Sequence, residues 1–240
     1  MALNPEEFYN EIMSQGVELF TGVPDSLLKE FCLVVEDRMS RQQHIITANE
    51  GNAVALACGH FLAKQSIPLV YMQNSGLGNA INPLLSLSDP DVYSIPLLLM
   101  IGWRGEPGVK DEPQHVKQGK IQIELMEAMD IPYEIFSNDS HDFKAKISKC
   151  IKLAKDENRP TALLIKKGTF GKYNKTVLLD ENQRMKREEA LEIILDNLSD
   201  ETIVVSTTGK TSREIFEIRE KNNQSHEKDF LTVGSMGHCS

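Results

Sequence analysis

Three continuous apolar runs constrain the fold of this chain more than any other feature of its sequence. They read IPLVYMQ at 67–73, IPLLLMIG at 95–102 and TALLIKK at 161–167. A strand that is apolar along its whole length, and not only at every second residue, leaves no face for water and must be covered on both sides. Such strands are typical of a parallel sheet with helices on either face, so the predicted fold class is α/β.

Strands and helices alternate around these runs. The predicted strands are 17–21, 44–48, 68–73, 95–101, 132–136 and 161–167, and the predicted helices between them are 26–38, 50–65, 77–88, 119–129 and 141–156, after a first helix that Asn4-Pro5 begins and Gly16 ends. Crossover helices between parallel strands build a doubly wound sheet. We therefore expect one domain at 1–168 with a doubly wound parallel sheet of six strands.

The rest of the chain predicts a linker and the start of a second domain. Residues 169–184 are polar and show no helical period, and 185–240 carry one helix–strand–helix–strand unit at 186–197, 202–206, 211–221 and 230–233. One such unit is too short to bury a parallel sheet on both faces. The second α/β domain is therefore expected to be truncated, or to be completed by strands of a partner chain.

Charge and cysteine content argue against several classes of protein. A net charge of −9 argues against a general binder of nucleic acids or anionic membranes. The four cysteines are far apart in sequence, without a CxxC pair or metal-ligand spacing, and are expected to be reduced thiols. The polar start MALNPEEFYNE does not resemble a signal peptide, and no apolar stretch approaches the ~20 residues of a membrane span. These features predict a cytoplasmic protein.

Glu50 is the candidate functional residue that stands out most. The predicted strand HIIT ends in Ala48-Asn49, and Glu50 then opens a helix of small and apolar residues, GNAVALACG. A carboxylate in such surroundings must be hydrogen-bonded or partly protonated. Either Glu50 is an ordinary first-turn glutamate favoured by the helix dipole, or it is placed there to share a proton with a bound group.

Polar and glycine-rich segments follow three other predicted strands. They are GVPDS at 22–26, NSGLGN at 74–79, and WRGEPG at 103–108, which continues as a long loop with His115 and Lys117. The carboxyl ends of parallel strands meet at one edge of a sheet, where ligands bind. Each residue also has a purely structural interpretation: Asp25 and Ser26 as turn or cap residues, Arg104 as half of a surface ion pair, and His115 as a solvated side chain. We expect these segments to converge on one crevice.

Six stretches of the chain together resemble the thiamine-diphosphate-dependent 2-oxoacid decarboxylases. In order along the chain they are FTGVPDSLLK, ANEGNAVALACGHFLA, MQNSGLGNAINPLLSL, IGWRGEPGVKDEPQH, TTGKTSREIFEIRE and GSMGHCS. The resemblance implies that 1–168 binds the pyrimidine ring of thiamine diphosphate, and that 185–240 begins the domain that binds its diphosphate through Mg²⁺. It also implies a homo-oligomer, at least a dimer, in which two subunits share each active site.

The same resemblance implies roles for single residues. Glu50 would be the glutamate that activates the cofactor by sharing a proton with its aminopyrimidine ring. Asp25 and His115 fall where related decarboxylases place an acid and a histidine that move protons. The residues expected against the cofactor, besides Glu50, are Asn74, Ser75, Gly76, Thr208, Gly209, Gly234, Ser235 and Met236.

The activity that the resemblance implies is that of a carbon–carbon lyase. The expected reaction is decarboxylation of 3-phosphonopyruvate to phosphonoacetaldehyde and carbon dioxide, in phosphonate biosynthesis. Sulfopyruvate or another 2-oxoacid is the alternative substrate. The anionic far end of such a substrate requires a local cationic group, and the candidates to bind it are Arg104, Lys117 and Ser26.

One motif of the family is missing from the sequence. The Gly-Asp-Gly and downstream Asn that bind Mg²⁺ do not occur, and they are expected beyond Ser240. Without these oxygen ligands the diphosphate has no metal anchor. The 240 residues alone are therefore expected to be inactive, and a catalytically inactive fragment or assembly module is the alternative that is not an enzyme.

Overall fold

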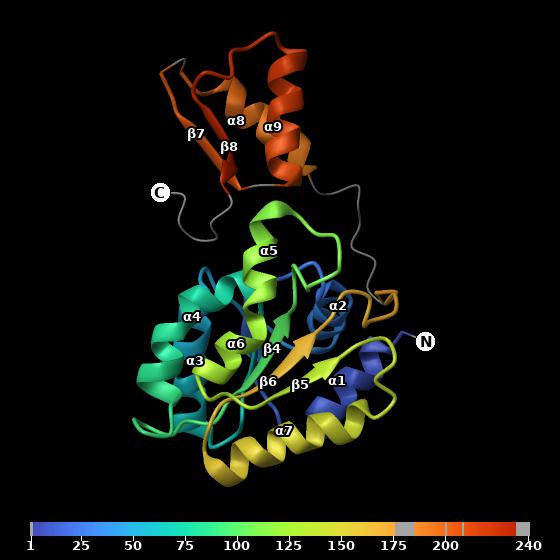
Figure 1. The fold of residues 1–240 in the computed structure, drawn as a ribbon. Coiled ribbons are helices and arrows are strands. Elements are labelled where there is room, and N and C mark those ends of the chain that lie inside the picture. Colours follow the sequence, from blue (N-terminus) through green and yellow to red (C-terminus); the bar gives the residue numbers. More distant parts are fainter. Residues whose placement is uncertain (1, 176–184, 200, 208, 234–240) are drawn as a thin grey trace. The chain divides into compact units, whose positions relative to one another are not determined.

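The computed structural model describes residues 2–175, 185–199, 201–207 and 209–233. The chain divides into two compact units, Met1–Val177 and Leu178–Ser240 (Figure 1). The larger unit contains strands β1 to β6, and the smaller unit contains β7 and β8.

The larger unit is built on a sheet of six parallel strands. In chain order they are β1 Phe20–Gly22, β2 His44–Ile46, β3 Leu69–Gln73, β4 Leu98–Gly102, β5 Tyr133–Phe136 and β6 Thr161–Ile165. In the sheet they lie in the order β2-β1-β3-β4-β6-β5. The chain moves outward from β1 to β2 and then returns past β1 to β3, which is doubly wound topology. The predicted fold class is therefore confirmed.

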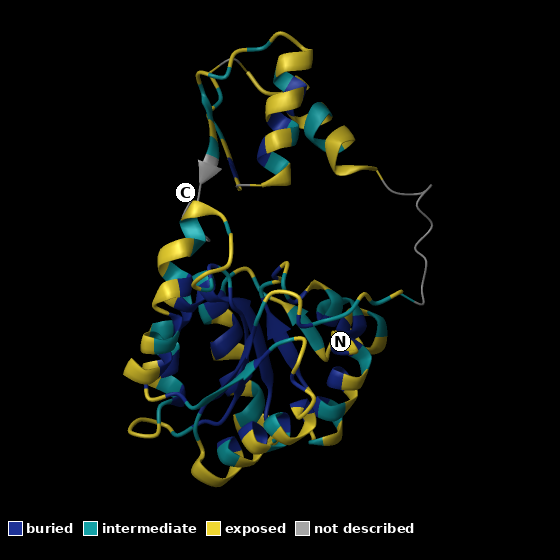
Figure 2. Ribbon diagram, turned by 45° about the vertical axis from the view of Figure 1, so that its right-hand side comes forward, coloured by how far each residue is buried: buried dark blue, intermediate teal, exposed yellow. Residues whose placement is uncertain are grey.

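Successive residues of the central strands enter two different apolar cores. On β4, Leu98 and Met100 belong to one core, and Leu99 and Ile101 belong to the other. Figure 2 shows the strands as the buried centre of this unit, surrounded by helices. A strand that is buried on both faces needs an apolar residue at every position, and this is the physical reason for the continuous runs in the sequence.

Helices cover both faces of this sheet. One core includes side chains of α1 Pro5–Ser14, α2 Lys29–Arg38 and α7 Phe143–Glu157, and the other includes side chains of α3 Glu50–Lys64, α4 Leu77–Pro83 and α6 Gln122–Ala128 (Figure 1). The 3₁₀ turn η1 Asn74–Gly76 precedes α4, and the π-helical turn η2 Leu84–Ser88 follows it. Among the described residues, no helix combines the length and the apolar character that crossing a bilayer requires.

The segment after β4 differs from its predicted conformation. The sequence predicts a long loop that contains His115 and Lys117, whereas the structure has a helix, α5 Pro113–Lys120, that carries both residues. Proline in the first turn and lysines in the last turn favour this short helix. Its polar composition and Gly119 conceal it in the sequence, because they leave no apolar helical period.

Residues 169–175, predicted as part of the linker, pack on the larger unit. The backbone N–H of Tyr173 donates to Glu30 Oε2 at 2.8 Å, and its hydroxyl donates to Asp37 Oδ2 at 2.7 Å. The packed part of this unit thus continues past residue 168. The rest of the predicted linker, 176–184, lies outside the described residues.

The smaller unit contains α8 Arg187–Asp196, β7 Val204–Thr207, α9 Lys210–Lys221 and β8 Asp229–Val233, in the order predicted from the sequence. Strands β7 and β8 pair in parallel, and Leu195, Ile215 and Ile218 form a small core. Large apolar side chains stay exposed on the described part of this unit: Ile193, Ile194, Ile203, Val205, Phe216 and Phe230. A single pair of parallel strands without neighbours is expected to expose such residues.

Replacing either of two glycines in α3 by alanine is expected to change the stability of the larger unit, but in opposite directions. A Cβ on Gly59 would meet no neighbouring atom within 4 Å, whereas a Cβ on Gly51 would lie 2.6 Å from the backbone oxygen of Asn79. Gly59→Ala is expected to raise the free energy of unfolding by about 0.5–1 kcal/mol, because glycine weakens a helix interior. Gly51→Ala is expected to lower the free energy of unfolding by at least ~1 kcal/mol, because the backbone at Asn79 would have to move to admit the new Cβ. Urea unfolding of both variants measures the signs, and a destabilised Gly59→Ala would contradict the open environment of that residue.

Candidate active site

Four polar segments lie at the carboxyl edge of the sheet in the larger unit. A turn with Asp25 follows β1, Glu50 begins α3 after β2, η1 follows β3 directly, and Arg104 follows β4. The side chain of Asn74 in η1 forms hydrogen bonds with the backbone of Arg104, and the Arg104 side chain forms one with Ser26. These contacts bring segments that are far apart in sequence into one place.

Glu50 is buried where α3 begins. Asn49 caps the helix by accepting from the N–H of Gly51 at 2.8 Å, and only 2% of Glu50 is exposed. The side-chain amide of Asn79 on α4 donates to Glu50 Oε2 at 2.8 Å, while Oε1 has no hydrogen-bond partner among the described residues. An unpaired buried carboxylate oxygen destabilises a fold, and its presence calls for a functional explanation. Oε1 is therefore available to pair with a ligand or to carry a proton.

Gly76 makes room for this carboxylate. A Cβ on Gly76 would lie 2.1 Å from Glu50 Oε1 and 2.3 Å from the carboxyl carbon. Any larger residue at position 76 would displace the carboxylate, because real Cβ atoms essentially never show contacts this short. The glycine that follows β3 is thus a requirement of the glutamate that follows β2.

Asp25 is a second buried carboxylate at this edge. It is 6% exposed, its Oδ2 accepts from the N–H of Leu27 at 3.0 Å, and its Oδ1 has no partner within the described part of the chain. Gly102 lies directly against it, since a Cβ there would be 2.2 Å from Asp25 Oδ2. Burial raises the pKa of Asp25, and the N–H of Leu27 and the charge of Arg104 offset only part of this effect. Asp25 therefore holds a proton more readily than an exposed aspartate does.

Arg104 forms the ion pair that its structural interpretation predicts. Its Nε donates to Asp111 Oδ2 at 2.7 Å, its Nη2 pairs with Asp111 Oδ1, and its Nη1 donates to Ser26 Oγ at 2.9 Å. The backbone N–H of Gly105 donates to the same carboxylate at 2.8 Å. Hydrogen bonds from Arg104 hold the pKa of Asp111 well below its usual range. Ser26 does not cap α2, because the helix begins after Leu28 without a side-chain cap.

Asn74 joins η1 to the segment that follows β4. Its Nδ2 donates to the Arg104 carbonyl at 2.8 Å, and its Oδ1 accepts from the Arg104 N–H at 3.1 Å. A buried amide that satisfies both of its groups on one backbone unit holds the two strand ends together. The neighbouring Ser75 is half-buried in the same turn.

His115 reaches this edge from α5. Its Nδ1 lies 3.2 Å from Nε2 of the buried Gln73, and because an amide nitrogen only donates, Nδ1 accepts. Burial, and next the charge of Arg104, lower the pKa of His115, so the neutral ring is favoured. The close approach of α5 depends on Gly105 at φ 68°, where a Cβ would lie 2.0 Å from the carbonyl oxygen of His115. Lys117, one half-turn further on, is exposed.

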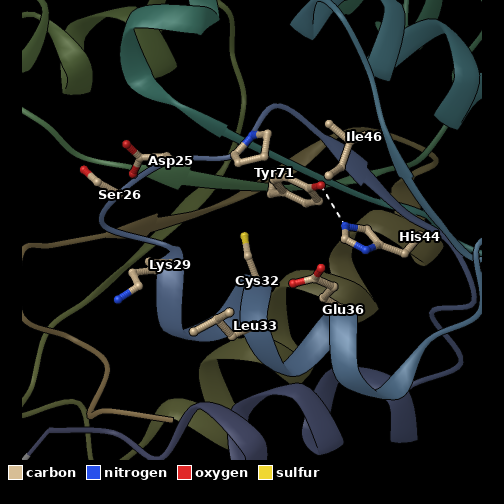
Figure 3. Close-up of a pocket in the computed structure, with 10 residues that line it drawn as sticks. Asp25, Ser26, Lys29, Cys32, Leu33, Glu36, His44, Ile46 and Tyr71 are labelled. Atoms are coloured by element: carbon tan, nitrogen blue, oxygen red, sulfur yellow. Dashed lines mark hydrogen bonds between the residues drawn. The ribbon is translucent and has the colours of Figure 1, made fainter. Parts of the chain in front are cut away.

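A cavity of about 330 Å³ opens beside Asp25 and Ser26. Figure 3 shows these two residues at one end and His44 and Tyr71 at the other, where His44 Nε2 and the Tyr71 hydroxyl lie 2.8 Å apart. The walls between them come mainly from α2, and they include the thiol of Cys32, whose pKa burial raises to about 12. The thiol therefore stays protonated, and it serves as an apolar wall. No motif of the sequence indicates this cavity, because its lining comes from separate elements.

The candidates in the second half of the chain are only partly described. Gly209 immediately precedes α9 with φ 104°, a conformation that favours glycine. Thr208, Gly234, Ser235 and Met236 lie outside the described residues. Across the described ranges, no three His, Cys, Asp or Glu side chains gather as a metal site.

Comparison with known proteins identifies the family. Residues 6–128 match the family described as "Thiamine pyrophosphate enzyme, N-terminal TPP binding domain". The chain belongs to the thiamine pyrophosphate enzymes. The match covers about half of the 240 residues and includes Asp25, Glu50, η1 and α5. The converging strand ends therefore lie within the cofactor-binding domain of this family.

Among the relatives in the thiamine pyrophosphate enzyme family are decarboxylases of two kinds. The chain is 32% identical to phosphonopyruvate decarboxylase of Streptomyces viridochromogenes over 241 residues, which cover 94% of the chain and 58% of the relative. It is 34% identical to sulfopyruvate decarboxylase subunit alpha of Methanococcus maripaludis over 161 residues, which cover 67% of the chain and 92% of the relative. The chain thus spans less than two thirds of the length of the phosphonopyruvate decarboxylase and nearly all of the alpha subunit.

A solved structure of the same fold is benzoylformate decarboxylase from Polynucleobacter necessarius. It aligns with a TM-score of 0.56 and 15% identity, and it covers 89% of this chain and 40% of that protein. At this identity the likeness shows the fold alone.

The larger unit fits the pyrimidine half of thiamine diphosphate. The buried Glu50 Oε1 lacks a partner within the described chain, and the residue of η1 beside it is Gly76, which has no side chain. A ring nitrogen that exchanges a proton with a carboxyl group would supply the missing partner. Residues that contact these groups were not evident from the sequence: Asn79 beside Glu50, Gln73 beside His115, Asp111 beside Arg104, and Gly102 beside Asp25.

Replacing Asp25 tests the effect of its burial. Because folding raises the pKa of Asp25, its contribution to stability is present below the unfolded pKa of about 4 and is lost as the pH rises through the folded value. Asp25→Asn is therefore expected to be more stable than the wild type near neutral pH and to lose this advantage in acid. Thermal unfolding across the pH range measures the difference. The exposed Asp91→Asn serves as the control, and an equal response of both variants would refute the burial of a proton-binding group at Asp25.

Proposed function

We propose that this chain is the pyrimidine-binding part of a carboxy-lyase that converts 3-phosphonopyruvate to phosphonoacetaldehyde and carbon dioxide in phosphonate biosynthesis. The unpaired, buried oxygen of Glu50 is the observation that supports a cofactor role for this edge of the sheet. The identity with a phosphonopyruvate decarboxylase across 94% of the chain supports the substrate.

Thiamine diphosphate, when bound, supplies the electron sink that loss of carbon dioxide from a 2-oxoacid requires. In our proposal Glu50 holds the proton that is shared with the pyrimidine ring, and Asn74, Ser75 and Gly76 form the wall against that ring. Thr208, Gly209, Gly234, Ser235 and Met236 would contact the cofactor from the second domain. Mg²⁺ would bind to oxygen ligands outside the described residues.

Asp25 and His115 are the candidates to move protons on the substrate. A carboxylic acid with a raised pKa can deliver a proton near neutral pH, which release of an aldehyde product requires. His115 is favoured in its neutral form, and because Nδ1 accepts from Gln73, the ring proton lies on Nε2, from which it can donate at the same pH. Two proton-bearing groups at one edge of the sheet support acid–base chemistry there.

Arg104, Ser26 and Lys117 are the candidates to bind the phosphonate. Arg104 and Ser26 are already joined at 2.9 Å beside Asp25, so an anion at this place could replace the neutral hydroxyl contact. A guanidinium binds a phosphonate bidentately, which a lysine cannot do. Asp111 holds Arg104 through Nε and Nη2, whereas Ser26 contacts Nη1.

A homo-oligomer completes the proposal. Helix α3 exposes Leu56 and Leu62, and the turn η2 exposes Leu85. Apolar side chains of this size are commonly covered by another subunit. The smaller unit likewise exposes apolar residues of β7 and β8 that further strands would cover. One relative is named as a subunit, so that protein acts within an assembly.

Sulfopyruvate decarboxylation is the second candidate. The match to the sulfopyruvate decarboxylase alpha subunit covers 92% of that protein, more than the 58% covered in the phosphonopyruvate decarboxylase. A sulfonate is also an anion that Arg104 can bind, but it carries one negative charge where a phosphonate carries up to two. Substrate competition separates the two reactions.

Glu50→Gln tests the cofactor role. The native protein, with Mg²⁺ and thiamine diphosphate, is expected to exchange the C2 proton of the cofactor for deuterium, and Glu50→Gln is expected to slow this exchange at least about 100-fold, because glutamine cannot share the proton. Quenched-flow NMR measures the rate. Glu127→Gln, an exposed position on α6, is the control. Unchanged exchange in Glu50→Gln would remove the proposed role, whereas absence of exchange in the native protein itself would favour an inactive assembly module.

A competition assay of the native protein tests which substrate it prefers. The assay offers 3-phosphonopyruvate, 3-sulfopyruvate and pyruvate together. 3-Phosphonopyruvate is expected to have the highest kcat/KM. Arg104→Lys is expected to raise KM for this substrate about tenfold and to leave pyruvate nearly unaffected, because only the far anion loses a bidentate contact. Lys110→Ala, on the same loop and exposed, is the control. A preference for pyruvate would contradict the proposed reaction.

A further inference from the structure

Asn79 is the residue whose side chain the structure places on Glu50. Its Nδ2 donates to Glu50 Oε2 at 2.8 Å, from α4 to the first turn of α3. The backbones of the two helices are also in contact here, because a Cβ on Gly51 would lie 2.6 Å from the Asn79 carbonyl oxygen. The side chain and the main chain of Asn79 thus both contact the start of α3. These two contacts fix the position of the Asn79 amide relative to the Glu50 carboxylate.

The amide divides the two oxygens of Glu50 into different roles. The hydrogen bond from the Asn79 amide is stronger when Oε2 is the unprotonated oxygen, because a carboxyl oxygen that carries the proton is the weaker acceptor. Oε1 lies against Gly76 and has no partner among the described residues. Any proton that Glu50 carries or shares is therefore directed to Oε1.

We propose that Asn79 is a positioning residue for Glu50, which holds Oε2 as an acceptor and reserves Oε1 for the proton shared with the cofactor. This inference rests on the proposed function, since it concerns how Glu50 performs that role. It assigns the second asparagine of NSGLGN a role that acts through Glu50, whereas the first, Asn74, forms its hydrogen bonds with the backbone of Arg104.

The same helix offers a matched control. Asn82 is exposed, and its Oδ1 accepts from Ser86 Oγ at 3.3 Å. Substitutions at Asn79 and Asn82 therefore change the same residue type on one short helix, but only those at Asn79 alter the surroundings of Glu50.

The first test needs neither cofactor nor turnover. Asn79→Asp places a second, half-buried carboxylate against the buried Glu50, so the folded pair is expected to retain a proton that the unfolded chain releases. A folded state that binds more protons loses stability as the pH rises. The unfolding temperature of Asn79→Asp, relative to the wild type, is expected to be lower at about pH 8 than at about pH 5 by about 4 °C or more, whereas Asn82→Asp changes little. Equal pH dependence of the two variants would overturn the inference.

The second test measures the shared proton itself and uses Asn79→Ala, which adds no charge. In the native protein with Mg²⁺ and thiamine diphosphate, loss of the donor is expected to slow C2 exchange about tenfold and to move its pH profile upward, because the carboxylate loses a charge-assisted hydrogen bond. Asn82→Ala is expected to change neither. An unaltered rate and profile in Asn79→Ala would overturn the inference even if Asn79→Asp fails to fold.

The Glu50→Gln result separates this inference from the proposed function. If Glu50→Gln retains exchange, the proposed role of Glu50 is wrong, and the positioning role of Asn79 falls with it. If Glu50→Gln loses exchange while Asn79→Ala behaves as wild type, only the inference on Asn79 is wrong. Loss in both, with Asn82→Ala unaffected, supports both.

Discussion

Burial of the sheet on both faces is the constraint on which the larger unit depends. Successive residues of its central strands enter separate apolar cores, so a polar side chain along these strands would have to find its hydrogen bonds inside an apolar layer. Polar chemistry is consequently confined to the strand ends. There the fold places two buried carboxylates, Glu50 and Asp25, each with an oxygen that lacks a partner in the described part of the chain.

Each carboxylate depends on a glycine at the end of another strand, one that lies two places away in the sheet. Gly76 leaves space for Glu50, and Gly102 leaves space for Asp25. Unpaired buried carboxylates lower the stability of a domain, and glycine adds conformational entropy to its unfolded state. Selection for stability alone would not favour buried unpaired carboxylates next to glycines. Such a cluster is typical of a site where function is maintained at the expense of stability.

The backbone of this site could be predicted from the sequence, and its side-chain partners could not. Continuous apolar runs identify strands that are buried on both faces, and parallel strands must end at a common edge, so Glu50, Asp25 and Arg104 could be assigned to that edge. Asn79 contacts Glu50 across 29 positions of sequence, and no periodicity or motif links the two residues. Helix α5 was hidden for a different reason: a short polar helix that is held by close backbone contacts has no apolar stripe.

The alternation of β3 between two cores also bears on how this protein can evolve. Leu69 and Tyr71 belong to one core, and Val70 and Met72 belong to the other. Exchange of one aliphatic residue for another leaves that assignment intact, whereas loss of a single residue would send each following side chain to the opposite face. The same slip would turn η1 away from Glu50. Descendants of this chain can therefore vary the identity of the strand residues far more freely than their number.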